Sequence, residues 1–269
     1  MNTSTTAIVT GGASGIGAAC VAALTARGVR VAVIDLPLQE ARCRRLLGSA
    51  VLFVAANASK RSEIESAVSR ASALLGVAVP DIVVATIGGN PHGLPRGTIL
   101  EETAAHVLAT VQMTLFSAYH IVEICARKMV AQADARPRSF VLIGSVMANF
   151  ARASAGAYTM SKVALCQFAR TSAATLGPHA IRVNVVQPGW IDTPGERKFS
   201  TQEMMDGAAR ALPLRRMGRA ADIGACVDFL TSDKASYITG QVLTVDGGYT
   251  VALDLPSTAS VDIDVASKL

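Results

Sequence analysis

A glycine-rich turn near the start of the chain constrains the fold more than any other feature of the sequence. The segment Ala7-Ile8-Val9 is typical of a short buried strand, and Thr10-Gly11-Gly12-Ala13-Ser14-Gly15-Ile16-Gly17 follows it directly. An apolar pattern with helical spacing, which includes Cys20 and Leu24, comes next. A strand, a glycine turn and a helix in this order favour the binding of a dinucleotide.

Three glycines of this turn suit contact with a pyrophosphate. Gly11, Gly15 and Gly17 would let the backbone turn sharply, and the helix N-terminus would offer free N–H groups to the anion. The next predicted strand, 29–34, ends at Asp35, eighteen residues beyond Gly17 (35 − 17). A carboxylate there would accept hydrogen bonds from an adenosine ribose diol and repel a 2′-phosphate, which predicts NAD as the cofactor.

The rest of the chain repeats the alternation of strand and helix. Apolar runs typical of strands lie at about 7–10, 29–34, 51–55, 81–86, 139–144, 182–187 and 241–245, with helical patterns between them. With 51% hydrophobic and 17% charged residues, the chain can cover a sheet on both faces. We therefore predict an α/β fold over residues 1–269, a single-domain Rossmann-like doubly wound parallel sheet of about seven strands, with 250–269 as a C-terminal tail.

A serine, a tyrosine and a lysine in the middle of the chain are suited to acid–base chemistry on an alcohol. Tyr158 lies thirteen residues beyond Ser145 (158 − 145) and four before Lys162. If about 157–176 forms a helix, Tyr158 and Lys162 project from the same face. A phenol titrates near ~10 in isolation, and an ammonium one helical turn away lowers that pKa. The spacing therefore predicts an activated base.

Together, these motifs resemble the short-chain dehydrogenase/reductase family. Thr10 to Gly17 is similar to its Thr-Gly-x-x-x-Gly-x-Gly loop, and Ser145, Tyr158 and Lys162 to its catalytic residues. Further matches are Arg182-Val183-Asn184-Val185 with Pro188-Gly189, Thr239-Gly240-Gln241, and Val245-Asp246-Gly247-Gly248. The resemblance covers about residues 5 to 250.

The resemblance implies a role for each matched position. Tyr158 would exchange the hydroxyl proton, Ser145 would hold the oxygen, and Lys162 would lower the tyrosine pKa and bind the nicotinamide ribose. Gln112 is the nearest counterpart of an asparagine that helps shape a helix distortion in the family's proton relay. The implied cofactor contacts are Gly11, Ser14, Gly15, Ile16, Gly17, Asp35, Asn57, Ala58, Gly88, Tyr158, Lys162, Pro188, Gly189, Ile191 and Thr193.

The chain departs from the family pattern beside the cofactor. Ala85-Thr86-Ile87-Gly88 replaces the common Asn-Asn-Ala-Gly, so the side-chain hydrogen bonds there are expected to be lost. Asn57 stands where an adenine-contacting aspartate is common, and its amide oxygen could accept the same hydrogen bond. Ser14 is neutral where members that use the phosphorylated cofactor often carry a basic residue, which again favours NAD.

Composition argues against several other functions. The net charge of +5 is spread along the chain, except for arginines at 42–45 and 215–219, and aromatics are only 4%, so we expect no nucleic-acid partner. One arginine of the first cluster could touch the adenosine end of the cofactor. His92, His106, His120 and His179 have no ligand-like spacing, so no metal is expected.

The chain is also expected to be cytoplasmic and to have no membrane segment. Its five cysteines include no Cys-x-x-Cys pair, which favours a reducing compartment. The uncharged stretch 1–26 has no basic start and carries the glycine turn, and the stretch 103–122 is interrupted by His106, Gln112 and His120.

The function predicted from the sequence is an NAD-dependent oxidoreductase that interconverts a small secondary alcohol and a ketone. One alternative is an NADP-dependent reductase of carbonyls or 3-oxoacyl thioesters, and another is a non-catalytic NAD-binding scaffold or sensor. The high apolar content and the family resemblance predict a homo-oligomer, expected to be a homotetramer, and the resemblance implies that helices at about 103–132 and 157–176 pair between subunits. The segment Thr193–Leu212 is predicted to be a mobile lid with a methionine face, although an ordinary surface helix would show the same pattern.

Overall fold

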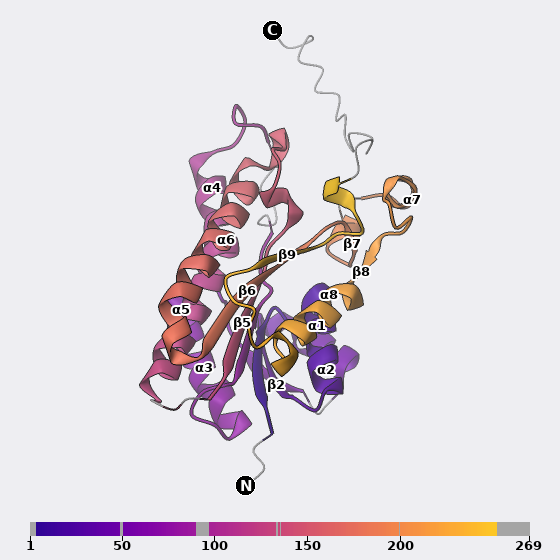
Figure 1. Ribbon diagram of the computed structural model, residues 1–269. Coiled ribbons are helices and arrows are strands. Elements are labelled where there is room, and N and C mark those ends of the chain that lie inside the picture. The colour runs from indigo at the N-terminus through magenta and orange to yellow at the C-terminus, as the bar shows by residue number, and fades with distance from the viewer. Residues whose placement is uncertain are drawn as a thin grey trace, which may run out of the picture.

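One parallel sheet organises the chain (Figure 1). The computed structural model describes residues 4–48, 51–89, 97–132, 134, 136–198 and 200–251. Within them the sheet has seven strands in the order β3-β2-β1-β4-β5-β6-β9, and every pairing is parallel. The strands are β1 Thr6–Thr10, β2 Arg30–Asp35, β3 Leu52–Ala55, β4 Ile82–Ala85, β5 Arg138–Ile143, β6 Ile181–Pro188 and β9 Val242–Val245. All seven predicted strands and their parallel arrangement are confirmed.

Helices cover both faces of this sheet, as predicted (Figure 1). One face carries α1 Gly15–Ala26, α2 Glu40–Leu47 and α8 Ala220–Leu230, and the other carries α3 Arg61–Leu75, α4 Ala104–Val111, α5 Ser117–Ala131 and α6 Gly156–Leu176. The helix α7, Gln202–Ala211, lies beyond the carboxyl ends of the strands, near the short pair β7 Ile191–Asp192 and β8 Gly218–Arg219.

The core follows from the alternation of side chains along each strand. In β1, Ala7 and Val9 pack with α1 and α8, whereas Ile8 between them packs with α3, α5 and α6. All three side chains are fully buried. Because both faces are covered, the strands are mostly apolar, and the polar side chains of the candidate site lie at or just beyond the strand ends.

The helix α4 continues into α5 through a π-helical segment, Gln112–Phe116. Together they form a helix of 28 residues, Ala104–Ala131, with a mean hydropathy of 1.3 over its most apolar window, 39% of which is buried. By length and composition alone this helix could cross a membrane. It packs against α3, α6 and β4, however, and a helix that packs against a protein core meets the same criteria.

Candidate active site

The first group of site residues lies where β5 ends and α6 begins. Ser145 follows β5 by two residues and is 8% exposed, and Tyr158 and Lys162 lie in the first two turns of α6. The Lys162 ammonium is 5.6 Å from the centroid of the Tyr158 ring. It also donates a hydrogen bond of 2.7 Å to the carbonyl oxygen of Ile143, the last residue of β5. The predicted helix is confirmed, and it ties Lys162 to the strand end that presents Ser145.

Burial changes the chemistry of Lys162. Its side chain is 2% exposed, and desolvation lowers its pKa from 10.5 to about 8, with a smaller opposing effect from Cys166. Lys162 is therefore mostly cationic at neutral pH but only moderately above its titration point. A cation in a site of low dielectric favours the ionised form of a neighbouring phenol more strongly than the same cation in water.

The glycine turn has the backbone geometry that a phosphate-binding loop requires. Gly11 and Gly15 have positive φ values of 72° and 50°, a conformation that side chains disfavour. A Cβ on Gly17 would lie 2.1 Å from the carbonyl oxygen of Gly11, so no larger residue fits there. Ser14 is the N-cap of α1 but makes no side-chain capping bond, and Ile16 lies in the first turn. The first N–H groups of the helix are thus left for an anion.

Thr86 corrects one expectation about the segment after β4. Its hydroxyl donates to the carbonyl oxygen of Thr10 over 2.7 Å, so a side-chain hydrogen bond to the glycine turn is kept there, not lost. Two residues on, Gly88 leaves room for its neighbours. A Cβ on Gly88 would lie 2.9 Å from the Lys162 nitrogen and 3.4 Å from the Thr114 methyl carbon.

Asp35 closes the adenosine side of the loop. Its two carboxylate oxygens accept hydrogen bonds from the N–H groups of Ala13 at 3.1 Å and Leu36 at 2.8 Å. Burial raises the pKa of Asp35, while these two N–H groups and Arg42 act in the opposite direction. Arg42 is thus a basic neighbour of Asp35, as the sequence had allowed for the first arginine cluster.

Asn57 and Ala58 lie beyond the end of β3. The Asn57 amide oxygen accepts from both the N–H group and the hydroxyl of Ser59, at 3.0 and 2.8 Å. Both of its lone pairs are therefore occupied in this structure, and the hydrogen bond from adenine to this oxygen stays a prediction. Ala58 is buried, with 2% of its surface exposed.

Gln112 does not join the catalytic group. Its exposed side chain donates to the carbonyl oxygen of Ser59 over 3.3 Å, on the adenosine side. Thr114 is the residue of this helix beside Lys162, and its hydroxyl bonds both the N–H and the carbonyl of Gly89, at 3.2 and 3.0 Å. The sequence analysis missed Thr114. A helix distortion is present as the π-helical segment Gln112–Phe116. Within this segment it is Thr114, and not the Gln112 side chain, that lies near Lys162.

The end of β6 forms the remaining wall. Pro188 is buried, and the Gly189 N–H donates to Val245 over 3.0 Å. Ile191, 6% exposed, begins β7, and Thr193 lies 3.5 Å from the position of a Cβ on Gly15. The segment after β6 therefore touches the glycine turn. Trp190 donates from its indole nitrogen to Glu196 over 2.7 Å, inside the predicted lid segment.

Some predictions lie outside the described residues. These are His92 and the tail beyond 251. Within the described ranges, no cluster of three or more His, Cys, Asp or Glu side chains could hold a metal ion.

Comparison with known proteins identifies a family. A family model described as "Enoyl-(Acyl carrier protein) reductase" matches residues 11–250. The chain is 30% identical to a cis-4-hydroxycyclohexanecarboxylate dehydrogenase of Sinomonas cyclohexanicum, over 91% of this chain and 96% of that protein. It is 31% identical to a 3-oxoacyl-acyl-carrier-protein reductase of Salmonella typhimurium, over 90% and 96%. The solved structure of a 7α-hydroxysteroid dehydrogenase with NADH and 7-oxo glycochenodeoxycholic acid is similar, with a TM-score of 0.82, 27% identity and coverage of 91% and 93%.

Proposed function

The chain belongs to the short-chain dehydrogenase/reductase family, and we propose that it is an NAD-dependent oxidoreductase that interconverts a secondary alcohol and a ketone. One observation carries this proposal. A buried lysine lies one helical turn from a tyrosine and bonds the end of the strand that precedes Ser145, in a chain whose first strand is followed by a glycine turn with no room for side chains at Gly11 and Gly17.

Each of the three side chains has one task in the proposed reaction. Tyr158 takes the hydroxyl proton when the alcohol is oxidised and returns it when the ketone is reduced. Ser145 donates a hydrogen bond to the substrate oxygen, and the Lys162 cation favours the tyrosine phenolate. When bound, NAD would supply the acceptor for the hydride that leaves the alcohol carbon. The direct test is reduction of NAD by a panel of sugars, cyclic alcohols, steroids and hydroxyacyl esters, read by absorbance.

Two observations bear on the choice between NAD and NADP. Asp35 lies at the end of β2, where its carboxylate would bond a ribose diol and repel a 2′-phosphate. Arg42 lies near enough to affect the Asp35 pKa and could contact that phosphate. We assign NAD because Asp35 is the residue fixed to the glycine turn. The runner-up, an NADP-dependent reductase of carbonyls or 3-oxoacyl thioesters, is favoured by Arg42 and by the similar acyl-carrier-protein reductase. Relative kcat/KM for the two cofactors decides between them.

A non-catalytic NAD-binding scaffold is the third candidate. A scaffold would gain nothing from a buried lysine, and the desolvation of that lysine destabilises the folded protein. The burial of Lys162 therefore favours the enzyme over the scaffold. Binding of NAD without turnover of any alcohol in the panel would favour the scaffold over the enzyme.

A groove between α5 and α6 supports a closed homo-oligomer, proposed here as a tetramer. It has a volume of about 640 Å³ and is lined by apolar residues including Val122, Ala126, Val130 and Phe168. Tyr119, also at the groove, is 41% exposed and packs against Phe168 with ring centroids 5.3 Å apart. A second copy of the chain, offering the same helices across a two-fold axis, would cover these side chains.

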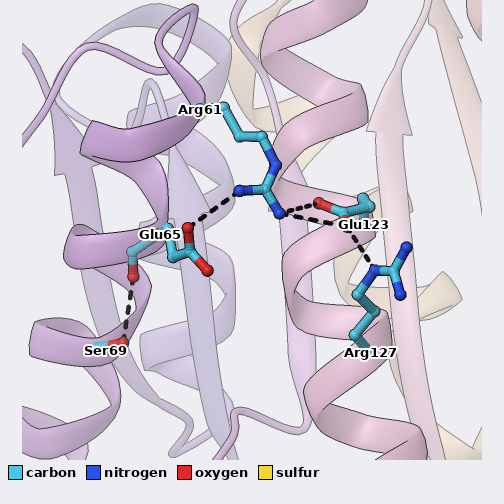
Figure 2. A network of polar contacts seen from close by, with 5 residues as sticks. All are labelled: Arg61, Glu65, Ser69, Glu123 and Arg127. Atoms are coloured by element: carbon cyan, nitrogen blue, oxygen red, sulfur yellow. Dashed lines mark hydrogen bonds and ion pairs between the residues drawn. The ribbon is translucent and has the colours of Figure 1, made fainter.

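The charged edge of the groove is already neutralised (Figure 2). Glu123 lines the groove and pairs with Arg127 on its own helix and with Arg61 on α3, and Arg61 also pairs with Glu65. Burial would raise the pKa of Glu123, but the two arginines lower it below its usual range. Covering an ion pair of this kind costs less than covering a lone carboxylate.

The oligomer has a matched test. Thr175 is exposed at the groove, and Thr25 is exposed on α1 at the opposite face of the sheet. Light scattering should show a tetramer for the wild-type protein and for Thr25→Arg, and smaller species for Thr175→Arg. A monomer of the wild-type protein at micromolar concentration contradicts the proposal.

We keep the lid as a proposal for 193–212. Met205 and Ala208 of α7 are buried, as is Leu212 directly after the helix, while Met204 is 45% exposed. Hydrogen exchange with NAD and a substrate analogue should slow in this segment. Unchanged exchange there, with protection elsewhere in the site, would leave an ordinary surface helix.

For the compartment we propose the cytoplasm, with a small-molecule substrate and no nucleic-acid or membrane partner. All five thiols are unpaired, and burial raises the pKa of Cys20 and Cys125 to about 12.

A further inference from the structure

A buried amide lies beneath the proposed catalytic group. Gln187 is in β6, directly before Pro188, and only 2% of its surface is exposed. A Cβ on Gly144, the residue before Ser145, would lie 3.1 Å from the Gln187 Cγ. Burying an amide costs free energy unless its hydrogen-bonding groups find partners. The partners of Gln187 therefore show which segments of the chain this side chain connects.

The Gln187 side chain joins three other segments of the chain. Its amide oxygen accepts from the Asn149 side-chain nitrogen at 3.1 Å and from the Thr244 hydroxyl at 3.3 Å. Its amide nitrogen donates to the Cys166 sulfur at 3.4 Å, one turn beyond Lys162 on α6. The two bonds to the amide oxygen connect the loop after β5 to β9, while the contact with sulfur is the weaker one because sulfur is a weak acceptor.

Asn149 ends the turn that orients the Ser145 hydroxyl. The Asn149 N–H donates to Val146 over 2.9 Å, and the Ala148 N–H donates to the Ser145 carbonyl over 3.0 Å. Inside this turn, the Met147 N–H donates to the Ser145 hydroxyl oxygen over 3.2 Å. The hydroxyl oxygen therefore accepts a bond from its own turn, and its proton is left to be donated elsewhere.

We propose that Gln187 is a positioning residue for Ser145, acting through Asn149. This rests on the proposed function, in which Ser145 bonds the substrate oxygen. Gln187 fixes the far end of the turn to the sheet, so that the Ser145 hydroxyl meets the substrate oxygen without first being ordered. The stacking of Phe150 on Tyr249, with ring centroids 5.7 Å apart, holds the next residue of the same loop to the segment after β9.

The partners of Gln187 distinguish positioning from a purely structural role. Asn149 is exposed and Thr244 half-exposed, so both polar groups reach water when the Gln187 oxygen is removed. Methionine has nearly the shape of glutamine and keeps the packing. Gln187→Met should therefore leave the melting temperature close to that of the wild-type protein, while the turn at Ser145 loses its anchor.

The experiment compares four single variants and one double variant with the wild-type enzyme on the best alcohol of the panel. Gln187→Met and Asn149→Ala should each lower kcat about tenfold or more, since an ångström of displacement can cost ~100-fold, and leave the KM for NAD unchanged. Together they should lower kcat no further than either alone, because they break the same bond. Gln187→Glu keeps the accepting oxygen and should retain most activity. Gln241→Met, the same change at an exposed position before β9, should have no effect.

The outcomes separate the two claims. Wild-type kcat in Gln187→Met overturns the positioning role, and so do additive losses in the double variant or a loss confined to the KM for NAD. Ser145→Ala, measured in parallel, tests the underlying function. If that variant keeps full turnover, the proposed role of Ser145 fails, and the positioning role fails with it. If it loses turnover while Gln187→Met does not, only the further inference fails.

Discussion

The two ends of the proposed cofactor site are built in opposite ways. At the end where chemistry is proposed, Lys162 and Ser145 are buried and are held by backbone atoms of β5 and the turn after it. At the adenosine end, Asp35 is half-buried and Gln112 is exposed, and Asn57 bonds its own loop. Charges at the first end interact in a buried environment of low dielectric constant. Polar groups at the second end are in contact with water, which weakens their electrostatic interactions.

This difference determines how much each residue can contribute. A group that acts on a reacting atom in a desolvated site changes rates by orders of magnitude. A hydrogen bond at a wet surface contributes about 1 kcal/mol. Substitutions at the buried end should therefore change turnover and leave NAD binding intact, and those at the exposed end should do the reverse.

Tyr158→Phe is expected to have the largest effect. The ring still packs, but the exchangeable proton is gone, so kcat should fall by about 10²–10⁴-fold while the Kd for NAD stays within twofold. Steady-state kinetics and calorimetric titration with NAD give the two quantities. Near-normal turnover in this variant would show that another residue handles the proton.

Lys162→Met should separate stability from function at the buried end. The lowered pKa, from 10.5 to about 8, corresponds to a cost of about 3 kcal/mol for burying the ammonium at neutral pH. The variant also loses the hydrogen bond to Ile143, which stabilises the folded protein by about 1 kcal/mol. The free energy of unfolding of Lys162→Met should therefore be about 2 kcal/mol higher than that of the wild-type protein, and the variant should have almost no turnover. A variant that is clearly less stable than the wild-type protein would contradict the claim that burial of the Lys162 ammonium destabilises the fold.

The same lysine predicts a pH dependence of stability. Its pKa is lower in the folded state than in the unfolded state, so between about 8 and 10.5 the unfolded chain binds more protons. The contribution of Lys162 to stability therefore rises with pH in this window. Denaturant titrations at pH 7 and pH 10 should show the advantage of Lys162→Met shrinking at the higher pH. An advantage that is constant across the window would mean that Lys162 is not the titrating group.

At the adenosine end, Asp35→Asn should change cofactor choice more than turnover. Removing the negative charge relieves repulsion of a 2′-phosphate beside Arg42, so the NAD/NADP ratio of kcat/KM should fall about tenfold or more. The Arg42→Ala variant is the matched control and should move the ratio toward NAD. Equal use of both cofactors by the wild-type enzyme would remove the basis for assigning NAD.

Gln112→Ala is expected to have the smallest effect. Its side chain bonds only the Ser59 carbonyl among the described contacts, so its loss should weaken NAD binding about threefold and leave kcat unchanged. Thr114→Val, on the same helix but beside Lys162, should lower kcat. If Gln112→Ala lowers kcat and Thr114→Val does not, the sequence-based role of Gln112 in the relay is restored.

The sequence predicted the parts of the molecule that depend on local spacing. The seven strands follow from short apolar runs that alternate with helical patterns, and the pairing of Tyr158 with Lys162 follows from the helical period of 3.6 residues. The contact of the Gln112 side chain with Ser59 did not follow from spacing, because it joins two segments that are far apart in the sequence, and the role of Gln112 in the proton relay stays a prediction. Arg42, Thr86 and Gln187 depend on contacts between distant segments, such as the bond from Thr86 to Thr10, and spacing along the chain carries no signal for them.

The most direct test of the account is to follow the hydride itself. Secondary alcohols that carry deuterium on the carbinol carbon are incubated with NAD and the wild-type enzyme or Tyr158→Phe, and the reduced cofactor is analysed by mass spectrometry. We predict deuterium in NADH from at least one alcohol with the wild-type enzyme, and at least 100-fold slower labelling with Tyr158→Phe at equal NAD occupancy. Equal labelling by the two proteins, or no labelling by a wild-type protein that binds NAD, would contradict the assignment of chemistry to the buried end.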